Sequence, residues 1–393
     1  MRFVEDLDVK GKTVFVRVDF NVPLTDLGEI RDDTRIRASL PTINYLVGKG
    51  AKLVLASHLG RPKGKFDPKM SLKPVAKRLR ELIGRDVILA PDVVGDVVDK
   101  LKASLKEGQL LLLENLRFYN GETANDPEFS KKLAQGIDYF VNDAFGSSHR
   151  AHASVVGITD YVKKSAAGYL MKKEVDYLRK ALFSPAKPYV AILGGAKAED
   201  KIPVIENLLN KADTILVGGA MAYTFFKAKG FDTGKSLVEP DKIEVAKKIL
   251  AQAKEKKVRF LLPLDHILAA SIESGQIVKI TDSFPFPQDL MGVDIGPKTI
   301  AKYTEIISKA KTIVWNGPLG VFETPAFAQG TVKIAEAVAN SGALSIVGGG
   351  DSIAAVEKAG VSRKITHIST GGGASLEYLA NETLPGIEAL EKK

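Results

Sequence analysis

Apolar runs of strand length recur along this chain at roughly 25–35 residue intervals, with helical hydrophobic patterns between them. This alternation is the period of βα units, in which a crossover helix follows each strand. Because the runs are nearly continuous in apolar residues, we expect parallel sheets covered on both faces. Such doubly wound sheets bind ligands at the carboxyl ends of their strands. The pattern therefore predicts an α/β fold with its sites at strand ends.

The runs form two sets, and 393 residues exceed one ordinary core. The first half contains VFVRVDFNV (14–22), KLVLASH (52–58), DVILAP (86–91), LLLLENL (110–116) and YFVNDAF (139–145). The second half contains YVAILGG (189–195), TILVGGA (214–220), RFLLPLD (259–265), TIVWNG (312–317), LSIVGGG (344–350) and ITHIST (365–370). We expect two Rossmann-like lobes, the first over 1–168.

A helix is predicted between the lobes, at the start of the segment from residue 169. Met171, Val175, Leu178 and Leu182 fall at helical spacing with charged residues between them, and the helix should stop before Pro185. This linking helix is either an ordinary amphipathic crossover or a hinge element, and the sequence favours neither.

Composition excludes several kinds of chemistry. The absence of Cys removes disulfides and thiolate sites, and five His leave little for a histidine metal cage. Neither a membrane-spanning run nor an apolar signal-peptide core is present, so a cytoplasmic protein is expected. The net charge of +9 invites a nucleic-acid role, but Lys and Arg alternate with acidic residues along helices, which favours small anionic substrates.

Three glycine clusters end strand-like runs in the second half: ILGGAKAEDK (192–201), IVGGGDS (346–352) and ISTGGGAS (368–375). Free N–H groups at a strand end that opens a helix suit phosphate. A single cluster is more often a tight turn, but three favour polyphosphate binding. GFDTGKS (230–236) imitates a P-loop with the wrong spacing, and no cluster satisfies G-x-G-x-x-G.

Charged residues accompany these clusters. Lys197 and Lys201 lie four residues apart, which on a helix places both ammonium groups on one face toward phosphates; a solvated surface pair is the alternative. Asp351 is either a magnesium ligand shared with nucleotide phosphates or the N-cap of the next helix. Glu323 could accept a ribose hydroxyl or face solvent.

The first half offers polar groups at strand ends. Strand alternation places Arg17, Asp19 and Asn21 on one face, so either Arg17 and Asp19 form an internal ion pair or the strand end faces a polar ligand. Further basic residues follow successive strands: Arg35, Arg37, His58, Arg61, Arg117 and Arg150. Several Arg on one rim suit a phosphate- and carboxylate-bearing substrate, with His58 as a contact to it.

At these residues the chain resembles the phosphoglycerate kinase family. The matching motifs lie in collinear order along nearly the whole chain: RVDFNVPL (17–24), SHLGRP (57–62), ENLRFY (114–119), NDAFGSSHRAHAS (142–154), GGAKAEDKI (194–202), WNGPLGVFE (315–323), VGGGDS (347–352) and STGGGASLEYL (369–379).

The resemblance implies a site in each lobe. The 3-phosphoglycerate site would comprise Asp19, Asn21, Arg35, His58, Arg61, Arg117 and Arg150. The nucleotide site would comprise Gly195, Lys201, Gly292, Val293, Asn316, Glu323, Gly349, Gly350, Asp351 and Ser352. Arg35, Lys197 and the N–H groups of Gly371 and Gly372 would meet the transferring phosphoryl group. The second lobe would end at 379, with 380–393 returning to the first.

The implied reaction is reversible transfer of the acyl phosphate of 1,3-bisphosphoglycerate to MgADP, which gives 3-phosphoglycerate and ATP in glycolysis. We expect direct in-line transfer after hinge closure. The protein is expected to be a monomer that binds neither nucleic acid nor membrane. The rivals are a kinase for another small carboxylate and a protein that binds both substrates without turnover.

Overall fold

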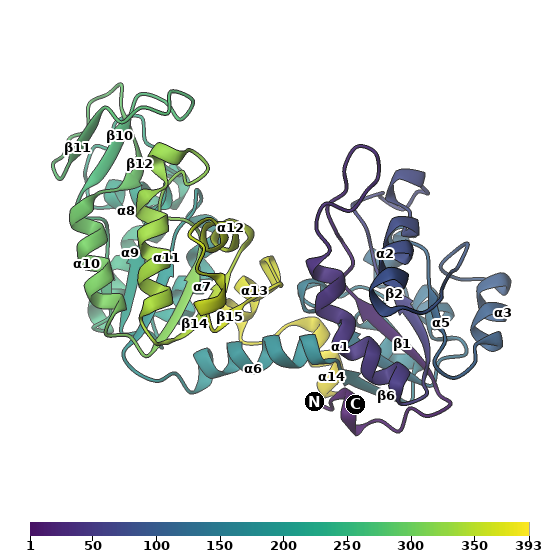
Figure 1. Cartoon of the computed structure of the whole chain (residues 1–393). Helices are drawn as coiled ribbons and strands as arrows, with labels where there is room; N and C mark the ends of the chain where they lie inside the picture. The colour runs from purple at the N-terminus through teal and green to yellow at the C-terminus, as the bar shows by residue number, and fades with distance from the viewer. Residues whose placement is uncertain (393) are drawn as a thin grey trace. The chain divides into compact units, whose positions relative to one another are not determined.

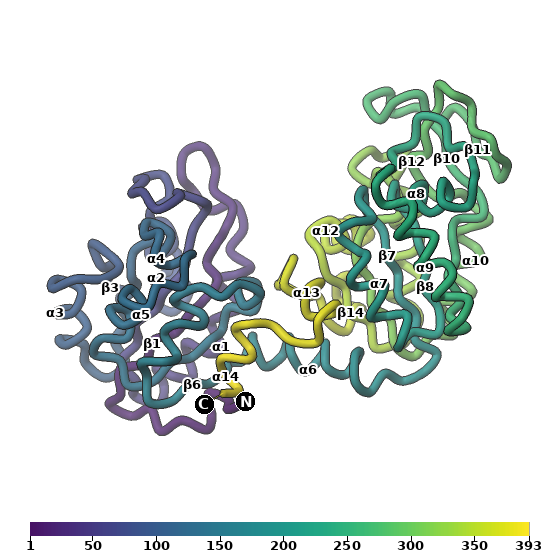
Figure 2. The backbone as a smooth tube through the Cα atoms, turned by 180° about the vertical axis from the view of Figure 1, so that it is seen from behind, coloured from purple at the N-terminus to yellow at the C-terminus, as the bar shows by residue number. Residues whose placement is uncertain are grey.

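The computed structural model describes residues 1–392 and divides into two compact units (Figures 1 and 2). The first unit comprises Met1–Asp176 together with the segment that begins at Thr383, and the second comprises Tyr177–Glu382. No helix within residues 1–392 is long and apolar enough to cross a membrane.

The first unit is built on a six-stranded parallel sheet in the order β3-β4-β2-β1-β5-β6. Its strands are β1 (Thr13–Val18), β2 (Lys52–Ala56), β3 (Val87–Leu89), β4 (Leu110–Leu112), β5 (Tyr139–Asp143) and β6 (Lys164–Ala167). Its helices are α1 (Thr34–Gly48), α2 (Lys73–Ile83), α3 (Asp96–Ser104), α4 (Asn120–Thr123), α5 (Pro127–Ala134) and α14 (Pro385–Glu391), with the start of α6 (Tyr169–Phe183). The parallel sheet predicted from apolar runs is confirmed.

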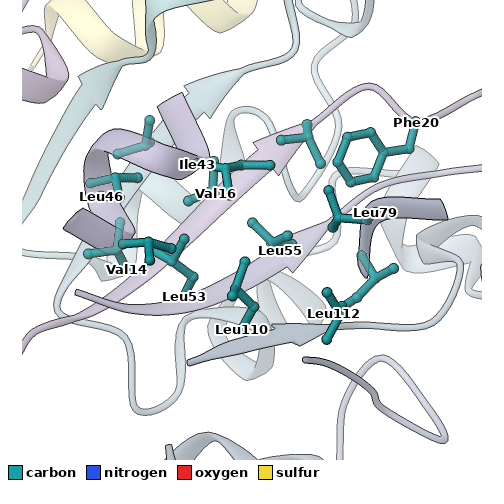
Figure 3. Packing of buried hydrophobic residues seen from close by; sticks show 14 of the residues in the cluster. Val14, Val16, Phe20, Ile43, Leu46, Leu53, Leu55, Leu79, Leu110 and Leu112 are labelled. Carbon is teal, nitrogen blue, oxygen red and sulfur yellow. The ribbon is translucent and has the colours of Figure 1, made fainter. Parts of the chain in front are cut away.

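Register explains the core of this unit. Val16 of β1 lies opposite Leu55 of β2, which lies opposite Leu112 of β4, and the residues two positions earlier form a second row. Side chains two apart on a strand share a face, so the rows present one apolar surface, which α1 and α2 cover with Ile43 and Leu79 (Figure 3). The residues between these rows are buried as well, so both faces of the sheet are covered.

The second unit repeats this plan with the strand order β15-β14-β13-β7-β8-β9, again parallel throughout. These strands are β7 (Tyr189–Leu193), β8 (Thr214–Val217), β9 (Arg259–Leu261), β13 (Thr312–Asn316), β14 (Leu344–Gly348) and β15 (His367–Ile368). The helices are α7 (Ile202–Leu208), α8 (Met221–Ala228), α9 (Ile243–Glu255), α10 (Pro297–Ile307), α11 (Gln329–Asn340), α12 (Gly350–Lys358) and α13 (Gly373–Asn381).

Sequence patterns missed four strands. A three-stranded antiparallel sheet joins β11 (Lys279–Thr281), β10 (His266–Ala269) and β12 (Met291–Ile295) in the second unit. Ile280 is half exposed at its edge, so β11 lacks the buried apolar run that predicts a strand. The fourth missed strand, β6, has the sequence KSAA, whose small residues give no apolar signal.

The predicted linking helix is α6, and the division between the units falls inside it, after Asp176. The four residues predicted to form its apolar stripe are at most 2% exposed, and the helix ends before Pro185. Whether it also acts as a hinge stays a prediction.

The start of α6 is fixed by a carboxylate from the sheet. Asp143, at the end of β5, accepts hydrogen bonds through Oδ1 from the N–H groups of Leu170 (2.9 Å) and Met171 (3.2 Å). It thus satisfies helix-start donors that a local N-cap would otherwise take. A Cβ on Gly168 would lie 2.2 Å from that oxygen, so only glycine admits the carboxylate here. Burial raises the pKa of Asp143 to about 7.

Substitution Asp143→Asn should change how the stability of the first unit depends on pH. The unfolded carboxyl has its ordinary pKa of 3.8, so between about pH 4 and 7 the folded state binds the extra proton. The stability that this proton contributes is complete below pH 4 and lost as pH rises through 7. Asn retains an acceptor oxygen without titrating, so D143N should gain stability relative to wild type between pH 5 and 8.

Urea unfolding followed by circular dichroism at pH 5, 6, 7 and 8 measures this difference. Asp8→Asn, at an exposed position in the same unit, is the control and should show no such trend. A pH-independent difference between D143N and wild type would contradict the assignment.

Candidate active site

Polar residues of the first unit gather where β1 and β2 end. The Asp19 carboxylate forms an ion pair with Arg35 at 2.8 Å, and Asn21 Oδ1 accepts a hydrogen bond from the Gly60 N–H at 2.9 Å. Arg117 Nη1 donates to the Gly60 carbonyl at 2.8 Å. Asn21 and Arg117 are thereby tied to the loop at Gly60, and Asp19 is tied to Arg35.

Of the two alternatives for the first strand, the internal ion pair between Arg17 and Asp19 is not formed. Because β1 ends at Val18, Asp19 leaves the strand alternation and turns to Arg35. Arg17 stays in the sheet, 1% exposed, and donates through Nε to Ser154 Oγ (2.8 Å) and through Nη2 to His58 Nδ1 (3.1 Å).

Most of the predicted arginine rim shares one electrostatic environment, but Arg37 does not belong to it, since Arg37 pairs with Asp33 beside a different cavity. The pKa of Arg117 is lowered to about 10, mainly by desolvation. The charges of Arg17 and Arg150 and, more weakly, of Arg61 add to this effect. Burial, then Arg17, Arg117 and Arg35, holds the pKa of His58 well below its ordinary value. Like charges this close repel one another, so the arrangement favours an anion between them.

A cavity of about 770 Å³ in the same unit lies elsewhere, lined by residues 28–33 and part of α2. None of the seven predicted substrate residues lines it. Its Asp33 carboxylate is paired with Arg37 and Arg78, each at 2.8 Å.

In the second unit the glycine turns bring backbones into contact. A Cβ on Gly194 would lie 2.1 Å from the Pro318 carbonyl oxygen and 2.8 Å from that of Gly317. The Gly195 N–H donates to the Pro318 carbonyl at 2.8 Å, which closes the turn after β7 onto the turn after β13. Glycine at 194 is therefore required by close approach.

A cavity of about 410 Å³ opens beside this contact. The glycine clusters after β7, β14 and β15 all contribute to its wall, with the side chains of Lys197, Lys201 and Asp351. Seven of the predicted nucleotide residues are part of that lining: Gly195, Lys201, Asn316, Gly349, Gly350, Asp351 and Ser352. Backbone N–H groups and ammonium groups around such a space suit a polyphosphate.

The helical turn predicted for Lys197 and Lys201 is not formed. A 3-10 helix covers Glu199–Lys201, and Lys197 precedes it in irregular backbone. Lys197 is exposed, whereas Lys201 is 9% exposed and burial lowers its pKa. Both lysines nevertheless line the same cavity.

A second, more apolar cavity of about 220 Å³ shares Gly195, Pro318 and Asp351 with the first. Gly292, Val293 and Glu323 line it, so all ten predicted nucleotide residues lie on these two adjoining cavities. An apolar recess that continues into a glycine-lined space fits a ligand with a planar base at one end and phosphates at the other.

Asp351 is not the N-cap of α12. Gly349 holds that position with φ of 92°, and Asp351 lies in the first helical turn with an exposed side chain. Within residues 1–392 no group of three or more His, Cys, Asp or Glu side chains could hold a metal. The carboxylate of Asp351 on both cavities instead fits an ion that phosphate oxygens help to hold.

The third glycine cluster contributes differently from the prediction. Gly372 and Gly373 line the larger cavity at the start of α13, with Gly372 at φ of 54°. The Gly371 N–H donates to Ser369 Oγ at 3.2 Å, so this donor is already engaged.

Sequence reasoning missed two side chains of the smaller cavity. A Cβ on Gly292 would lie 1.8 Å from the Tyr223 hydroxyl, which makes that glycine necessary. Asp294 accepts hydrogen bonds from the N–H groups of Ile295 and Gly330, both at 2.8 Å, and burial raises its pKa to about 7. Neither residue lies in a recognisable motif. The only local signal near them is the GGA that ends the 214–220 run, whose Gly219 and Ala220 line the same cavity.

Comparisons with known proteins agree along the whole chain. A family model described as Phosphoglycerate kinase matches residues 4–382. The phosphoglycerate kinase of Acidobacterium capsulatum is 60% identical and covers 99% of each chain. A protein of Triticum aestivum named "Phosphoglycerate kinase, cytosolic" is 54% identical over 98% of this chain and 97% of its own. The solved phosphoglycerate kinase of Coxiella burnetii superposes with a TM-score of 0.91 at 41% identity, and the match covers 99% of this chain and 98% of that one.

Substitution Gly194→Ala should destabilise the second unit by about 1–3 kcal/mol, because its methyl group would meet backbone that cannot rotate away. Trp315, the only tryptophan, donates from its indole to the Gly317 carbonyl at 2.8 Å and reports the change. Urea unfolding followed by tryptophan fluorescence measures it.

Gly350→Ala is the matched control, since nothing lies within 4 Å of a Cβ at 350. It should unfold at or near the wild-type midpoint. Equal midpoints for G194A and wild type would show that the turn after β7 can move.

Proposed function

Because the chain belongs to the phosphoglycerate kinase family, we propose that its two units divide the substrates of that reaction. The chain is a kinase of glycolysis that uses ATP or ADP and a carboxyl group as phosphoryl acceptor. The single observation that carries the division is that the ten predicted nucleotide residues adjoin one pair of cavities in the second unit.

The nucleotide is assigned to the second unit. The base and ribose would occupy the smaller cavity, with Glu323 toward the ribose and Val293 against the base. The phosphates would extend into the larger cavity, where Lys201 and the glycine N–H groups supply positive ends. Asp351, which borders both cavities, would hold Mg²⁺ together with phosphate oxygens, and the ion would neutralise phosphate charge.

The acid substrate is assigned to the first unit. Arg35, Arg117 and the neighbouring arginines of the rim would hold the phosphate and carboxylate of 3-phosphoglycerate. Asn21 and Asp19 are proposed to orient the substrate and Arg35, since each already fixes a neighbouring group.

Direct in-line transfer is proposed. The transition state spreads charge over three equatorial oxygens, so cations and N–H donors stabilise it without a covalent nucleophile. Lys197 and Arg35 are proposed to contact the transferring group. Gly372 keeps its proposed donor role, whereas the N–H of Gly371 would first have to leave Ser369.

Reaction in the cytoplasm by a monomer is part of the proposal. The name of the wheat relative, a cytosolic phosphoglycerate kinase, supports the compartment. Alternating charges along helices such as α9 support a protein without a nucleic-acid partner.

A coupled assay tests the acceptor. ADP formation should require ATP, Mg²⁺ and 3-phosphoglycerate together, and acetate or carbamate in place of 3-phosphoglycerate should give no turnover. Turnover with acetate alone would assign the rim to a different carboxylate, and Mg²⁺-independent turnover would remove Asp351 from its role.

Substitution Lys197→Ala should lower kcat by about 10²–10³-fold, because it removes a cation that acts mainly in the transition state. The Kd for ATP, measured by calorimetry, should change less than fivefold. Lys201→Ala should instead weaken ATP binding more than it lowers kcat. Lys201 is buried beside the proposed phosphate site, so it would contact the phosphates in the ground state as well as in the transition state.

Lys248→Ala, an exposed lysine on α9, is the control and should leave both constants unchanged. Equal loss of kcat and ATP affinity in K197A would mean that Lys197 binds ground-state nucleotide.

A further inference from the structure

A buried chain of hydrogen bonds lies behind His58 in the first unit. Ser154 Oγ donates to Glu122 Oε1 at 2.6 Å, Arg17 Nε donates to Ser154 Oγ at 2.8 Å, and Arg17 Nη2 lies 3.1 Å from His58 Nδ1. Glu122 and Ser154 are fully buried, and Arg17 and His58 are at most 5% exposed. The bond between Arg17 and Ser154 joins residues 137 positions apart in the sequence.

The direction of each proton along this chain is determined. Burial raises the pKa of Glu122, whereas the charge of Arg17 and both hydrogen bonds from Ser154 oppose this rise. As a carboxylate Glu122 can only accept, so the short contact uses the single hydrogen of the Ser154 hydroxyl. Glu122 Oε2 also accepts from the Ser154 N–H at 3.0 Å, so both of its oxygens are satisfied as an anion. The Ser154 oxygen then accepts from Arg17, and the guanidinium shares its charge with Glu122 through this hydroxyl.

The guanidinium fixes the histidine. Every nitrogen of Arg17 is a donor, so His58 Nδ1 must accept and the ring proton must be on Nε2. We propose that Glu122, Ser154 and Arg17 are positioning residues that hold His58 in its Nε2–H tautomer and so present one neutral N–H donor to the acid substrate. This inference rests on the proposed contact between His58 and 3-phosphoglycerate.

The other two protonation states of His58, the Nδ1–H tautomer and the imidazolium, are unfavourable in this environment. A proton on Nδ1 would set two N–H donors against each other, and an imidazolium would add a positive charge to the rim. The charged and titratable groups that face the ring from the elements around it are Arg17, Arg117, Arg35 and His152. With burial, they hold the pKa of His58 well below its ordinary value, so this donor stays available across neutral pH.

The Nε2 side of the ring is the free side. No hydrogen bond from any residue within 1–392 reaches this nitrogen. A neutral donor there can bind a phosphate or carboxylate oxygen and, unlike another arginine, adds nothing to the repulsion among Arg35, Arg117 and Arg17.

Nitrogen NMR of the full chain labelled with ¹⁵N-histidine tests the tautomer directly. The chain has five His, and the spectrum of His58→Asn identifies the signals of His58. From pH 6 to 8 we expect an unprotonated Nδ1 and a protonated Nε2. A protonated Nδ1, or an imidazolium at pH 7, would overturn the proposal. This measurement needs no substrate, so it is independent of whether 3-phosphoglycerate is the acceptor.

Ser154→Ala tests the positioning role. Without the bridge, Arg17 keeps its hydrogen bonds to the Val18 carbonyl and, at 3.4 Å, to Ser147 Oγ, but loses its link to Glu122. We therefore expect mixed His58 tautomers and a KM for 3-phosphoglycerate raised about tenfold or more, with the KM for ATP unchanged. Ser39→Ala is the matched control, because Ser39 is buried in the same unit and its hydroxyl makes no hydrogen bond within residues 1–392.

If S154A leaves the His58 tautomer and the KM for 3-phosphoglycerate unchanged, the positioning role of this hydrogen-bond chain is refuted. If S39A changes both as much as S154A does, the effect comes from core packing and not from the chain. If S154A does not fold, the wild-type spectrum still decides the tautomer on which the proposal depends.

Discussion

Burial of both faces of each parallel sheet is the constraint on which the rest of this molecule depends. A polar side chain inside such a sheet must find partners from distant segments, as Arg17 does, or leave the sheet at a strand end, as Asp19 does. Strands that run parallel end at a common edge, so these polar groups collect there. In the first unit this edge holds arginines, and in the second it holds glycine turns.

The two edges are suited to anions in different ways. In the second unit the donors are largely backbone N–H groups, whose positions are fixed by turns that permit little adjustment around Gly194. In the first unit the donors are long side chains that repel one another, and the fold limits this repulsion by burying Glu122 beneath Arg17 and Arg117. A preorganised backbone cradle and a compensated cationic rim are two ways to avoid reorganisation when substrate binds.

Sequence patterns predicted those features whose signals are local. Apolar runs gave both parallel sheets, and the glycine clusters marked the cavity that Gly195 and Gly350 line. Contacts set by distant segments left no local signal. Tyr223 reaches Gly292 only through tertiary packing, and Ser154 contacts Arg17 from 137 positions away in the sequence. The antiparallel sheet that contains β11 was missed because its edge residues are exposed and too few to form a pattern.

The placement of α14 has a consequence for how the chain folds during synthesis. Its Ile387 and Leu390 are buried in the first unit, and the Gly386 N–H donates to the Ser148 carbonyl at 2.9 Å. The second unit, in contrast, is one uninterrupted segment, Tyr177–Glu382. A ribosome therefore completes the second unit before it supplies the helix that finishes the first. Amino-terminal domains usually fold first during synthesis, but here the first unit can be completed only after the second.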